Sequence, residues 1–479
     1  MKKIILLGAL MLTLAGCGGG GGSAGACNGS SQVCFPPVET PAPGPGVVET
    51  PAPGPVAVES LANICTPTGE KNWLRAHLDD VYLWYNEIVN VAPLDYATPA
   101  DYFYALLVRA RDRFSFTVSQ AVIDQYFLAG QDVGYGATFV NDSGRLRVSY
   151  TQPQSPAEQQ NLVRGAEIVG INGVSLSAVD GATKNAALYP SKAGTTTQFQ
   201  VLDPGAAAAR TVPLSSITIR KYPVPISKII TTAENKKLGY LVFTDHIATA
   251  EDPLITTLTQ FQKNGIDDLV LDLRYNGGGF LYIASQVGSM IGGGAVKNKV
   301  FEQLRFNAKH QEKTNAPDNT FLFFDTSTTN KPLPQLNLKR VFVLIGAGTC
   351  SASESIINGL SPHVEVILVG GTTCGKPYGM MQKNNCSQAY FAIEFDGINS
   401  AGQGGYTAGF APKCAAADDL EHQLGDVNER LLSSAISYSK TGSCPAADSL
   451  FHAPAVRDAL MNVREVYRAP WRDNRIVKP

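Results

Sequence analysis

The second half of the chain alternates short apolar runs with amphipathic segments. The segments between the runs place apolar residues at helical spacing around 253–264, 281–290 and 352–360. Four runs have the length of buried strands: KLGYLVF at 237–243, DDLVLDLR at 267–274, RVFVLIGA at 340–347 and VEVILVGG at 364–371. Alternation of this kind is typical of an α/β sheet whose functional groups gather at strand ends. The pattern therefore predicts an α/β core within residues 214–479.

Residues 61–128 follow a helical pattern. A second helix is predicted from Pro99 to about Arg113, because proline suits the first helical position and Thr98 suits the N-cap. The apolar positions that define the first helix are Trp73, Leu74, His77, Leu78, Val81 and Trp84. We interpret these aromatic and aliphatic residues as core, and the segment as an N-terminal helical domain.

Residues 129–213 change to short β-like stretches, and one passage there is similar to PDZ domains. In SPAEQQNLVRGAEIVGINGVSL the match is carried by Gly165, Ala166, Ile168, Ile171, Asn172 and Gly173. The resemblance implies that the loop Gly134, Tyr135, Gly136 and Ala137 binds the carboxylate of a peptide that adds a strand to the sheet. The alternative is a small β domain with glycine turns, since Asn172-Gly173 is also an ordinary hairpin signal.

The first residues have the features of an export signal. Lys2 and Lys3 precede the apolar run Ile4–Leu14, which is too short to span a membrane and is followed by LAGC. This ending resembles a bacterial lipobox, which implies cleavage before Cys17 and lipidation of its thiol. The alternative is ordinary secretion. Gly18 in place of a retaining aspartate favours the outer membrane, so we expect a lipoprotein of the bacterial cell envelope that faces the periplasm or the exterior.

A linker is predicted over residues 18–60. It contains a run of glycines and an exact repeat, VETPAPGP at 38–45 and 48–55. Proline at this density favours extended polyproline II, which acts as a semi-rigid spacer. A proline-rich ligand for a partner is the alternative, but no basic residue marks a docking motif.

Charge and cysteine content limit the function classes. The net charge of −2 leaves no basic excess to neutralise phosphates, so we expect no nucleic-acid partner.

Eight cysteines remain besides Cys17, an even number that indicates disulfides in an exported chain, although the pairing is open. A metal site is the rival interpretation. It is disfavoured because no CxxC pair occurs and the six histidines are scattered, so we expect no metal ligands and no cofactor.

A serine and a lysine lie 25 positions apart, each just after an apolar run. Ser351 is in TCSASESIINGL and Lys376 is in GGTTCGKPYG. Neighbouring strand ends would bring both to one crevice, where a neutral, buried lysine can take the proton of a serine nucleophile. A helix starting at Ala352 would favour developing negative charge. If the two meet, Cys350 and Cys374 beside them would be close enough to bond.

Other interpretations of these segments exist. Ser351-x-x-Glu354 is also a capping box, in which Ser351 would be only an N-cap. Gly370 to Lys376 fits GxxxxGK, but Pro377 replaces the residue that binds magnesium in a P-loop. Ser437-x-x-Lys440 overlaps Lys440-Thr441-Gly442, and one lysine cannot serve both of these β-lactamase-type motifs, so chance explains them better.

A glycine-rich segment, DLRYNGGG at 272–279, follows the second apolar run. Its successive glycines allow backbone N–H groups to turn into the site. One of them and the N–H of Ala352 would form an oxyanion hole. The alternative is a simple strand-to-helix turn. GxGxxG is absent, so a dinucleotide site is not supported.

The order VLDLRYNGGG, TCSASE and GKPYG, after the PDZ-like passage, resembles the C-terminal processing (tail-specific) serine peptidases over residues 61–445. The resemblance implies a multidomain α/β protein with a crotonase-like (ClpP-like) peptidase core and no cofactor. It also implies Ser351 as nucleophile, Lys376 as general base, and Gly278 and Ala352 as oxyanion-hole donors.

Two positions depart from that family pattern. Gly277 replaces the proline before the paired glycines, and Met380 replaces the glutamine four residues after the lysine. Gln382 is the nearest glutamine and a weak candidate for orienting Lys376. The GKPYG variant suggests a lipoprotein branch of the family.

The sequence therefore predicts a lipid-anchored serine endopeptidase with a Ser-Lys dyad. Its partners would be a protein or peptide substrate, recruited by its C-terminus through the PDZ-like domain, and a membrane. The alternative function is a catalytically inactive, peptide-binding scaffold lipoprotein on the same fold. An ATPase would instead need nucleotide binding at residues 370–376.

Overall fold

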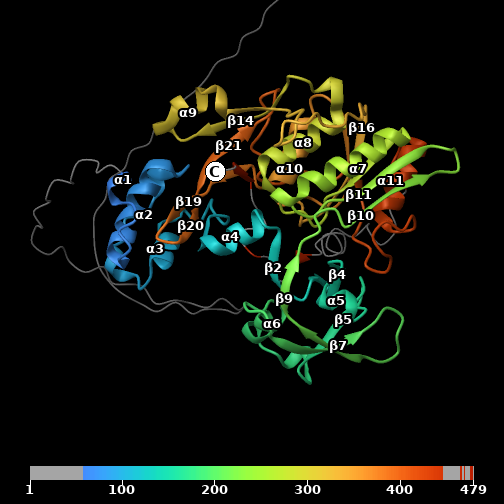
Figure 1. The fold of residues 1–479 in the computed structure, drawn as a ribbon, viewed down its shortest axis with the longest axis horizontal. Helices are drawn as coiled ribbons and strands as arrows, with labels where there is room; N and C mark the ends of the chain where they lie inside the picture. Colours follow the sequence, from blue (N-terminus) through green and yellow to red (C-terminus); the bar gives the residue numbers. More distant parts are fainter. Residues whose placement is uncertain (1–57, 446–463, 466–468, 470–474, 478–479) are drawn as a thin grey trace, which may run out of the picture. The chain divides into compact units, whose positions relative to one another are not determined.

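The computed structural model describes residues 58–445, 464–465, 469 and 475–477 (Figure 1). The chain divides into an N-terminal unit, residues 1–54, and a second unit, residues 55–479. The predicted signal peptide, the lipidation site Cys17 and nearly all of the predicted linker lie outside the described residues. Among the residues that are described, no helix has the length and apolar character needed to cross a membrane.

A six-stranded sheet forms the centre of the second unit. Its order is β10 (Ile226–Thr231), β11 (Lys237–Val242), β12 (Asp268–Asp272), β16 (Arg340–Ile345), β17 (Glu365–Gly370) and β22 (Cys414–Ala415). The strands from β11 to β22 are parallel, and β10 is antiparallel at one edge. β11, β12, β16 and β17 lie within the four apolar runs, so the predicted α/β core is confirmed.

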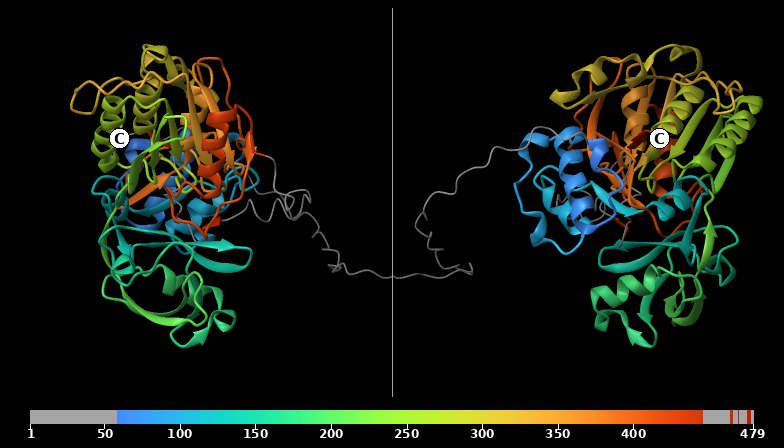
Figure 2. Two further views of the ribbon diagram at one scale, coloured as in Figure 1. Left: turned by 90° about the vertical axis from the view of Figure 1, so that its right-hand side faces the viewer. Right: turned by 60° about the vertical axis from the view of Figure 1, so that its left-hand side comes forward.

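Helices cover both faces of this sheet. They are α7 (Glu251–Asn264), α8 (Leu281–Gly292), α10 (Ala352–Leu360) and α11 (Arg430–Thr441). Alternate strand residues divide between two hydrophobic clusters: Leu271 and Val343 belong with α7, α8 and α10, whereas Val270 and Phe342 belong with α11. Figure 2 shows the yellow-green helices α7 and α8 and the orange-red helix α11 on opposite sides. Strands buried on both faces explain the continuous apolar runs.

A second six-stranded sheet was not predicted from the sequence. Its order is β13 (Gly279–Phe280), β24 (Arg475–Val477), β18 (Tyr378–Met381), β21 (Ile393–Ile398), β14 (Val300–Phe306) and β15 (Thr320–Leu322). A short helix, α9 (Gln311–Asn315), lies between β14 and β15 in the chain. β13 directly follows the glycine-rich segment and β18 directly follows Lys376, so this sheet fixes two parts of the predicted site.

The N-terminal part of the described chain is mainly helical, as predicted. It contains α1 (Val58–Leu61), α2 (Pro67–Val81), α3 (Pro99–Leu106) and α4 (Gln120–Phe127). Thr98 caps α3, because its Oγ1 accepts the Asp101 N–H at 3.1 Å. α3 ends earlier than the predicted Arg113, since Leu107 is extended and Asp112 Oδ1 accepts the N–H groups of the next turn.

One strand in this part was missed. β1 (Phe116–Ser119) pairs with β20 (Gln388–Phe391), which pairs with β19 (Lys383–Asn385). A disulfide between Cys65 and Cys386 also joins the helical segment to this hairpin. The N-terminal segment is therefore anchored to the part of the chain that follows Lys376.

His77 on α2 gives a testable pH dependence. It is buried and stacked on Trp73, and burial, aided by Lys383 and Lys313, lowers its pKa to about 3. The folded state binds a proton at His77 less readily than the unfolded state. The contribution of neutral His77 to the free energy of unfolding is therefore fully present above pH 6.5 and is lost as the pH falls toward 3. When the pH falls from 6 to 5, we expect the free energy of unfolding of the wild type to decrease by up to about 1.4 kcal/mol more than that of the non-titrating variant His77→Phe. Denaturant melts at both pH values measure the difference, and equal slopes would contradict it.

Residues 131–220 form a β-rich region with its own hydrophobic core. One sheet contains β3 (Ala137–Asp142), β4 (Arg145–Thr151), β5 (Glu167–Ile171), β6 (Val174–Ser175), β7 (Thr196–Leu202), β8 (Arg210–Ser215) and β23 (Arg464–Glu465). The other elements are β2 (Gln131–Gly134) paired with β9 (Ile217–Arg220), α5 (Pro156–Gln159) and α6 (Gly181–Leu188). Asn172 and Gly173 have φ of 51° and 80° and form the predicted hairpin turn.

Candidate active site

Ser351 lies at the turn between β16 and α10, and its backbone is strained. It has φ 60° and ψ −113°, a region that residues other than glycine rarely occupy. The residue is fully buried, and Ser351 Oγ has no hydrogen-bond partner among the described residues. A strained residue with an unused hydroxyl at a helix N-terminus points to a functional role.

Glu354 connects the serine segment to the lysine segment. Its Oε2 accepts the N–H groups of Ser351 and Lys376, both at 2.9 Å. Its Oε1 accepts the Gly375 N–H at 2.8 Å and the Thr373 hydroxyl at 2.6 Å. The bond from the Ser351 N–H is the carboxylate half of a capping box, but Glu354 does more than cap the helix, because it fixes the two predicted catalytic segments to one carboxylate.

Lys376 is fully buried. Its Nζ is 3.9 Å from Met380 Sδ and 5.0 Å from the centroid of the Phe114 ring. Gln382, named above as a weak candidate, donates instead to Asn384 Oδ1 at 3.0 Å. The contact to Met380 shows that the position four residues after the lysine does face it, although its side chain offers only a weak acceptor. The segment then continues into β18, not into a helix, so a P-loop is excluded here.

Three disulfides are present among the described cysteines. Cys350 is bonded to Cys374, so the two residues that flank the predicted catalytic pair are joined, as the sequence suggested. The other bonds join Cys65 to Cys386 and Cys414 to Cys444. Cys350, Cys374 and Glu354 lie close enough together to hold an ion. The two sulfurs are bonded to each other, however, and do not offer thiolate ligands.

The glycine-rich segment is held by Asn276, which the sequence did not single out. Its backbone oxygen accepts the Cys350 N–H at 3.1 Å and the Ser353 hydroxyl at 2.9 Å. Its Oδ1 accepts the Gly278 N–H at 2.9 Å and lies 3.0 Å from His246 Nδ1. The predicted oxyanion donor Gly278 is therefore engaged in this structure, while Ala352 is the first residue of α10, where a helix provides no acceptor for the N–H.

Comparison with protein families agrees with this geometry. Residues 237–395 match the model described as peptidase family S41, and residues 69–116 match the peptidase S41 N-terminal domain. The first range contains the glycine-rich segment, Ser351, Glu354 and Lys376. Both matched ranges of the chain belong to peptidase family S41.

Individual curated relatives match about half of this chain. It is 29% identical over 237 residues to a carboxyl-terminal-processing protease of Picosynechococcus, covering 50% of this chain and 51% of the relative. It is 26% identical over 250 residues to the carboxy-terminal processing protease CtpB of Bacillus subtilis, covering 51% and 46%. The chain thus spans about half the length of the curated relatives it matches.

A solved structure supports the S41 fold over a larger part of the chain. A Bacteroides fragilis protein assigned to the S41 proteases superposes with a TM-score of 0.62 at 24% identity. The match covers 78% of this chain and 97% of that protein. At this identity the similarity shows a shared fold.

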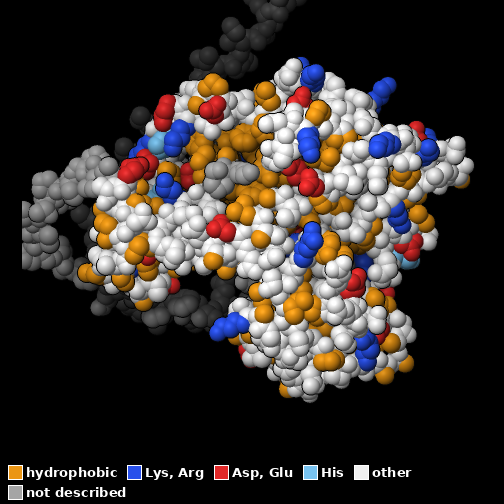
Figure 3. Space-filling view, viewed as in Figure 1, with side chains coloured by type: hydrophobic (Ala, Val, Ile, Leu, Met, Phe, Trp, Pro, Cys, Tyr) orange, Lys and Arg blue, Asp and Glu red, His pale blue; other side chains and the backbone are white. Residues whose placement is uncertain are grey.

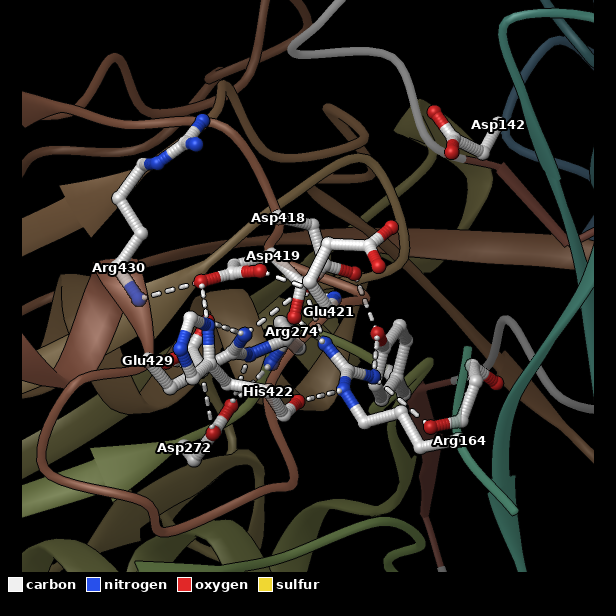
Figure 4. Close-up of polar contacts among 12 residues, drawn as sticks. Asp142, Arg164, Asp272, Arg274, Asp418, Asp419, Glu421, His422, Glu429 and Arg430 are labelled. Carbon is white, nitrogen blue, oxygen red and sulfur yellow. Dashed lines mark hydrogen bonds and ion pairs between the residues drawn. The ribbon is translucent and has the colours of Figure 1, made fainter. Parts of the chain in front are cut away.

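A buried network of charges supports the start of the S41 glycine-rich segment (Figure 4). Arg274 donates to Asp272, Asp418 and Glu429 at 2.7–3.0 Å. Arg164 of the β-rich region donates to the same Asp418 at 2.6 Å and to the Tyr275 hydroxyl at 2.6 Å. The two guanidinium groups hold the pKa of Asp418 well below its usual range despite its burial. The network joins the β-rich region to the segment that precedes Gly278.

The loop predicted to bind a carboxylate borders a cavity of about 320 Å³. Gly134, Gly136 and Ala137 line it together with Lys221 and Ala469. Tyr135 also borders the cavity, but its hydroxyl donates to Thr197 Oγ1 at 2.8 Å and its ring packs against Phe199 in the core. Gly136 has φ 80°, and a Cβ there would lie 2.2 Å from Ser155, so only glycine fits.

The face shown in Figure 3 combines an apolar area with scattered charges. Hydrophobic side chains gather over the region where β14 and β21 lie in Figure 1. Lys, Arg, Asp and Glu side chains are distributed singly around it. β14 and β21 belong to the same sheet as β13 and β18, so this apolar area lies over the sheet that also contains the strands after the two predicted catalytic segments.

Proposed function

We propose that this S41 chain is a serine endopeptidase with Ser351 as nucleophile and Lys376 as general base. The observation that carries the proposal is the strained, buried Ser351 with an unused hydroxyl, tied through Glu354 to the peptide group of Lys376. A neutral Lys376 takes the Ser351 proton as Oγ attacks the scissile carbonyl. It returns that proton to the leaving amine, and water then hydrolyses the acyl-enzyme.

The oxyanion of the tetrahedral intermediate would be bound by the N–H groups of Gly278 and Ala352. Because Gly278 donates to Asn276 Oδ1 and the Ser351 hydroxyl makes no hydrogen bond with the described residues, the structure corresponds to a resting state in this proposal. A turn of the Asn276 side chain or of the Gly278 peptide would release the donor. Substrate binding is the natural trigger, since it supplies the oxyanion.

The substrate in this proposal is a protein or peptide with an accessible C-terminus. The glycine loop at 134–137 and the adjoining cavity are of the kind that hold a terminal carboxylate. The apolar area over β14 and β21 suits an extended, unfolded segment. A labelled peptide with a free carboxylate should bind at least tenfold more tightly than its amide, and equal binding would overturn this role.

Lipid anchoring through Cys17 and a place in the bacterial envelope, with the outer membrane favoured, complete the proposal. Its support is the sequence alone, with the basic residues, the apolar run and LAGC before a glycine- and proline-rich linker. Mass spectrometry of the mature N-terminus decides it. An unmodified Cys17, or a signal cleaved elsewhere, would refute the anchor without affecting the peptidase.

The peptidase is tested by labelling the full chain with a serine-directed fluorophosphonate and mapping the adduct. The adduct should form on Ser351 and be absent from Ser361 at the other end of α10, which is exposed and serves as an internal control. Casein cleavage is measured beside it, because Ser-Lys enzymes can resist such reagents. Absence of both signals would favour the inactive, peptide-binding lipoprotein.

A further inference from the structure

The last described strand of the chain lies between the two segments that build the catalytic centre. β24 pairs in parallel with β13 on one side, where Gly279 is opposite Arg475. It pairs in parallel with β18 on the other side, where Met380 is opposite Ile476. The strand Arg475–Val477 is therefore part of the sheet that positions Gly278 and Lys376, although it begins 99 residues beyond that lysine in the sequence.

Arg475 on this strand contacts both catalytic segments from the buried side. Its Nη2 donates to the carbonyl oxygen of Pro377, next to Lys376. Its Nη1 pairs with Glu302 on β14 and lies 3.3 Å from Ser355 Oγ on α10. Arg475 and Glu302 are 0% and 1% exposed. Burying this pair is costly, so a role in shape or position is required to explain it.

Two side chains hold the backbone of the turn around Lys376, one before the lysine and one after it. Glu354 accepts the N–H groups of Gly375 and Lys376, and Arg475 donates to the carbonyl group of Pro377. The side-chain position where a glutamine would orient the lysine is taken by Met380, which contacts Nζ only through sulfur. The backbone of the turn sets where the Lys376 side chain begins, so its position affects where Nζ lies.

We propose that Arg475 is a positioning residue for Lys376. The proposal rests on the proposed Ser-Lys function. A lysine at position 475 keeps the charge for Glu302, but it is a single point and cannot reproduce the fork that reaches Glu302 and Pro377 together. Displacement of the lysine turn by about 1 Å is enough to cost about 10²-fold in turnover.

The test compares Arg475→Lys with Arg305→Met in the full chain. Arg305 lies on β14 of the same sheet and makes a two-pronged contact with Asp396, which is opposite Tyr378 of β18. Its side chain is 45% exposed, however, and β21 separates it from β18, so it serves as the control. We expect Arg475→Lys to lower kcat about 10²-fold with little change in KM, and to shift the pH at which kcat is half-maximal. Arg305→Met should change kcat less than twofold.

Amide hydrogen exchange gives a second measurement that needs no activity. In Arg475→Lys the exchange of residues 375–381 should accelerate at least tenfold, while exchange in β12 and β16 stays unchanged. Unchanged exchange at 375–381, or an unchanged kcat and pH profile in an active wild type, would overturn the proposal. If the wild type cleaves nothing but the exchange responds, the peptidase assignment fails and the positioning of the turn stands.

A separate observation concerns the edge of β3. β23 pairs antiparallel with β3, with Arg464 opposite Asn141 and Glu465 opposite Val140, while the other edge of β3 pairs with β4. Ala469, four residues later, lines the cavity beside Gly134 and Gly136. A peptide bound by strand addition would use this same edge and cavity.

We infer that the strand Arg464–Glu465 is an internal ligand that competes with substrate for the β3 edge. This inference rests on the proposed peptide-binding role of that region. The segment is tethered, through α11 before it and β24 after it, so its effective concentration at the edge is on the order of mM. A free peptide must therefore displace it before binding.

The substitution Glu465→Pro tests this competition, because proline removes the N–H that a paired strand donates. Glu465→Ala keeps that N–H and is the matched control. By fluorescence anisotropy, a labelled peptide with a free carboxylate should bind Glu465→Pro at least about tenfold more tightly than Glu465→Ala or wild type. Equal affinities would overturn the inference.

Hydrogen exchange of β3 separates the two possible failures. In Glu465→Pro without peptide, residues 137–142 should lose protection. If no protein binds the peptide but protection is lost, the peptide-binding role fails and the tail pairing stands. Unchanged protection means that the tail does not cover the edge.

Discussion

Replacing Ser351 with alanine is expected to reduce peptide-bond hydrolysis about 10⁴-fold or more. The hydroxyl is the only group in the proposed mechanism that forms the acyl-enzyme, and removing such a nucleophile leaves only binding and oxyanion stabilisation. Stability should remain the same or rise slightly, because Ser351 Oγ is buried without a hydrogen-bond partner and its loss removes an unsatisfied polar group. Casein turnover and thermal melting of the full chain measure the two effects.

Ser361→Ala is the matched control for this prediction. Ser361 follows the last residue of α10, and its hydroxyl donates to the Asn358 carbonyl at 2.9 Å on the surface side of the site. Turnover of Ser361→Ala should stay within about twofold of the wild-type value, since substitutions at exposed positions usually have small effects. Turnover in Ser351→Ala equal to that of the control would remove Ser351 as the nucleophile and revive the capping interpretation.

Local patterns predicted the elements of the catalytic core well. α10 begins at Ala352 as expected, and α7 and α8 differ from the expected helices by two residues at one end. The reason is that each strand is buried on both faces and each helix has one apolar face, so periodicity determines their type. The Ser351 and Lys376 segments follow β16 and β17, which neighbour each other in the sheet. Parallel neighbours bring their following loops to one edge.

Long-range partners could not be predicted in the same way. Asn276, Arg164 and Arg475 act on groups that lie 74, 254 and 98 residues away: the Cys350 N–H, Asp418 and the Pro377 carbonyl. Nothing in the local pattern around an arginine distinguishes a buried partner from a surface charge. Arg475 lies in a tail with Trp471 and several arginines, where the pattern predicts only a short helix near Val456–Val466, and its β24 is only three residues long. Such short strands have no detectable period.

Glu354 shows how a correct local interpretation can be incomplete. The sequence Ser351-x-x-Glu354 predicts a capping box, which competes with a catalytic role for the serine. In the structure the carboxylate accepts the Ser351 N–H and also three donors from residues 373–376. The motif is therefore compatible with the proposed catalytic arrangement, because the residue that caps α10 also fixes the lysine segment beside it.

Glu354→Gln is expected to have the second-largest effect on this chain. All four contacts of the carboxylate come from donors, and an amide of the same shape must direct its NH₂ group at two of them. Loss of charge-assisted bonds at a fully buried site should cost roughly 3 kcal/mol or more of unfolding free energy. Turnover measured where the variant is folded should fall at least about 10²-fold, because the peptide groups of Ser351 and Lys376 lose their common acceptor.

Glu365→Gln provides the control, since Glu365 begins β17, is 56% exposed and makes only a distant ion pair with Lys413. It makes the same chemical change on the strand that leads to the lysine segment, and it should shift unfolding free energy by less than about 0.5 kcal/mol. Denaturant melts and casein turnover distinguish the two variants. If Glu354→Gln matched Glu365→Gln in both measurements, the shared carboxylate would not hold the catalytic pair, and the lysine turn would depend on Arg475 and the Cys350–Cys374 bond alone.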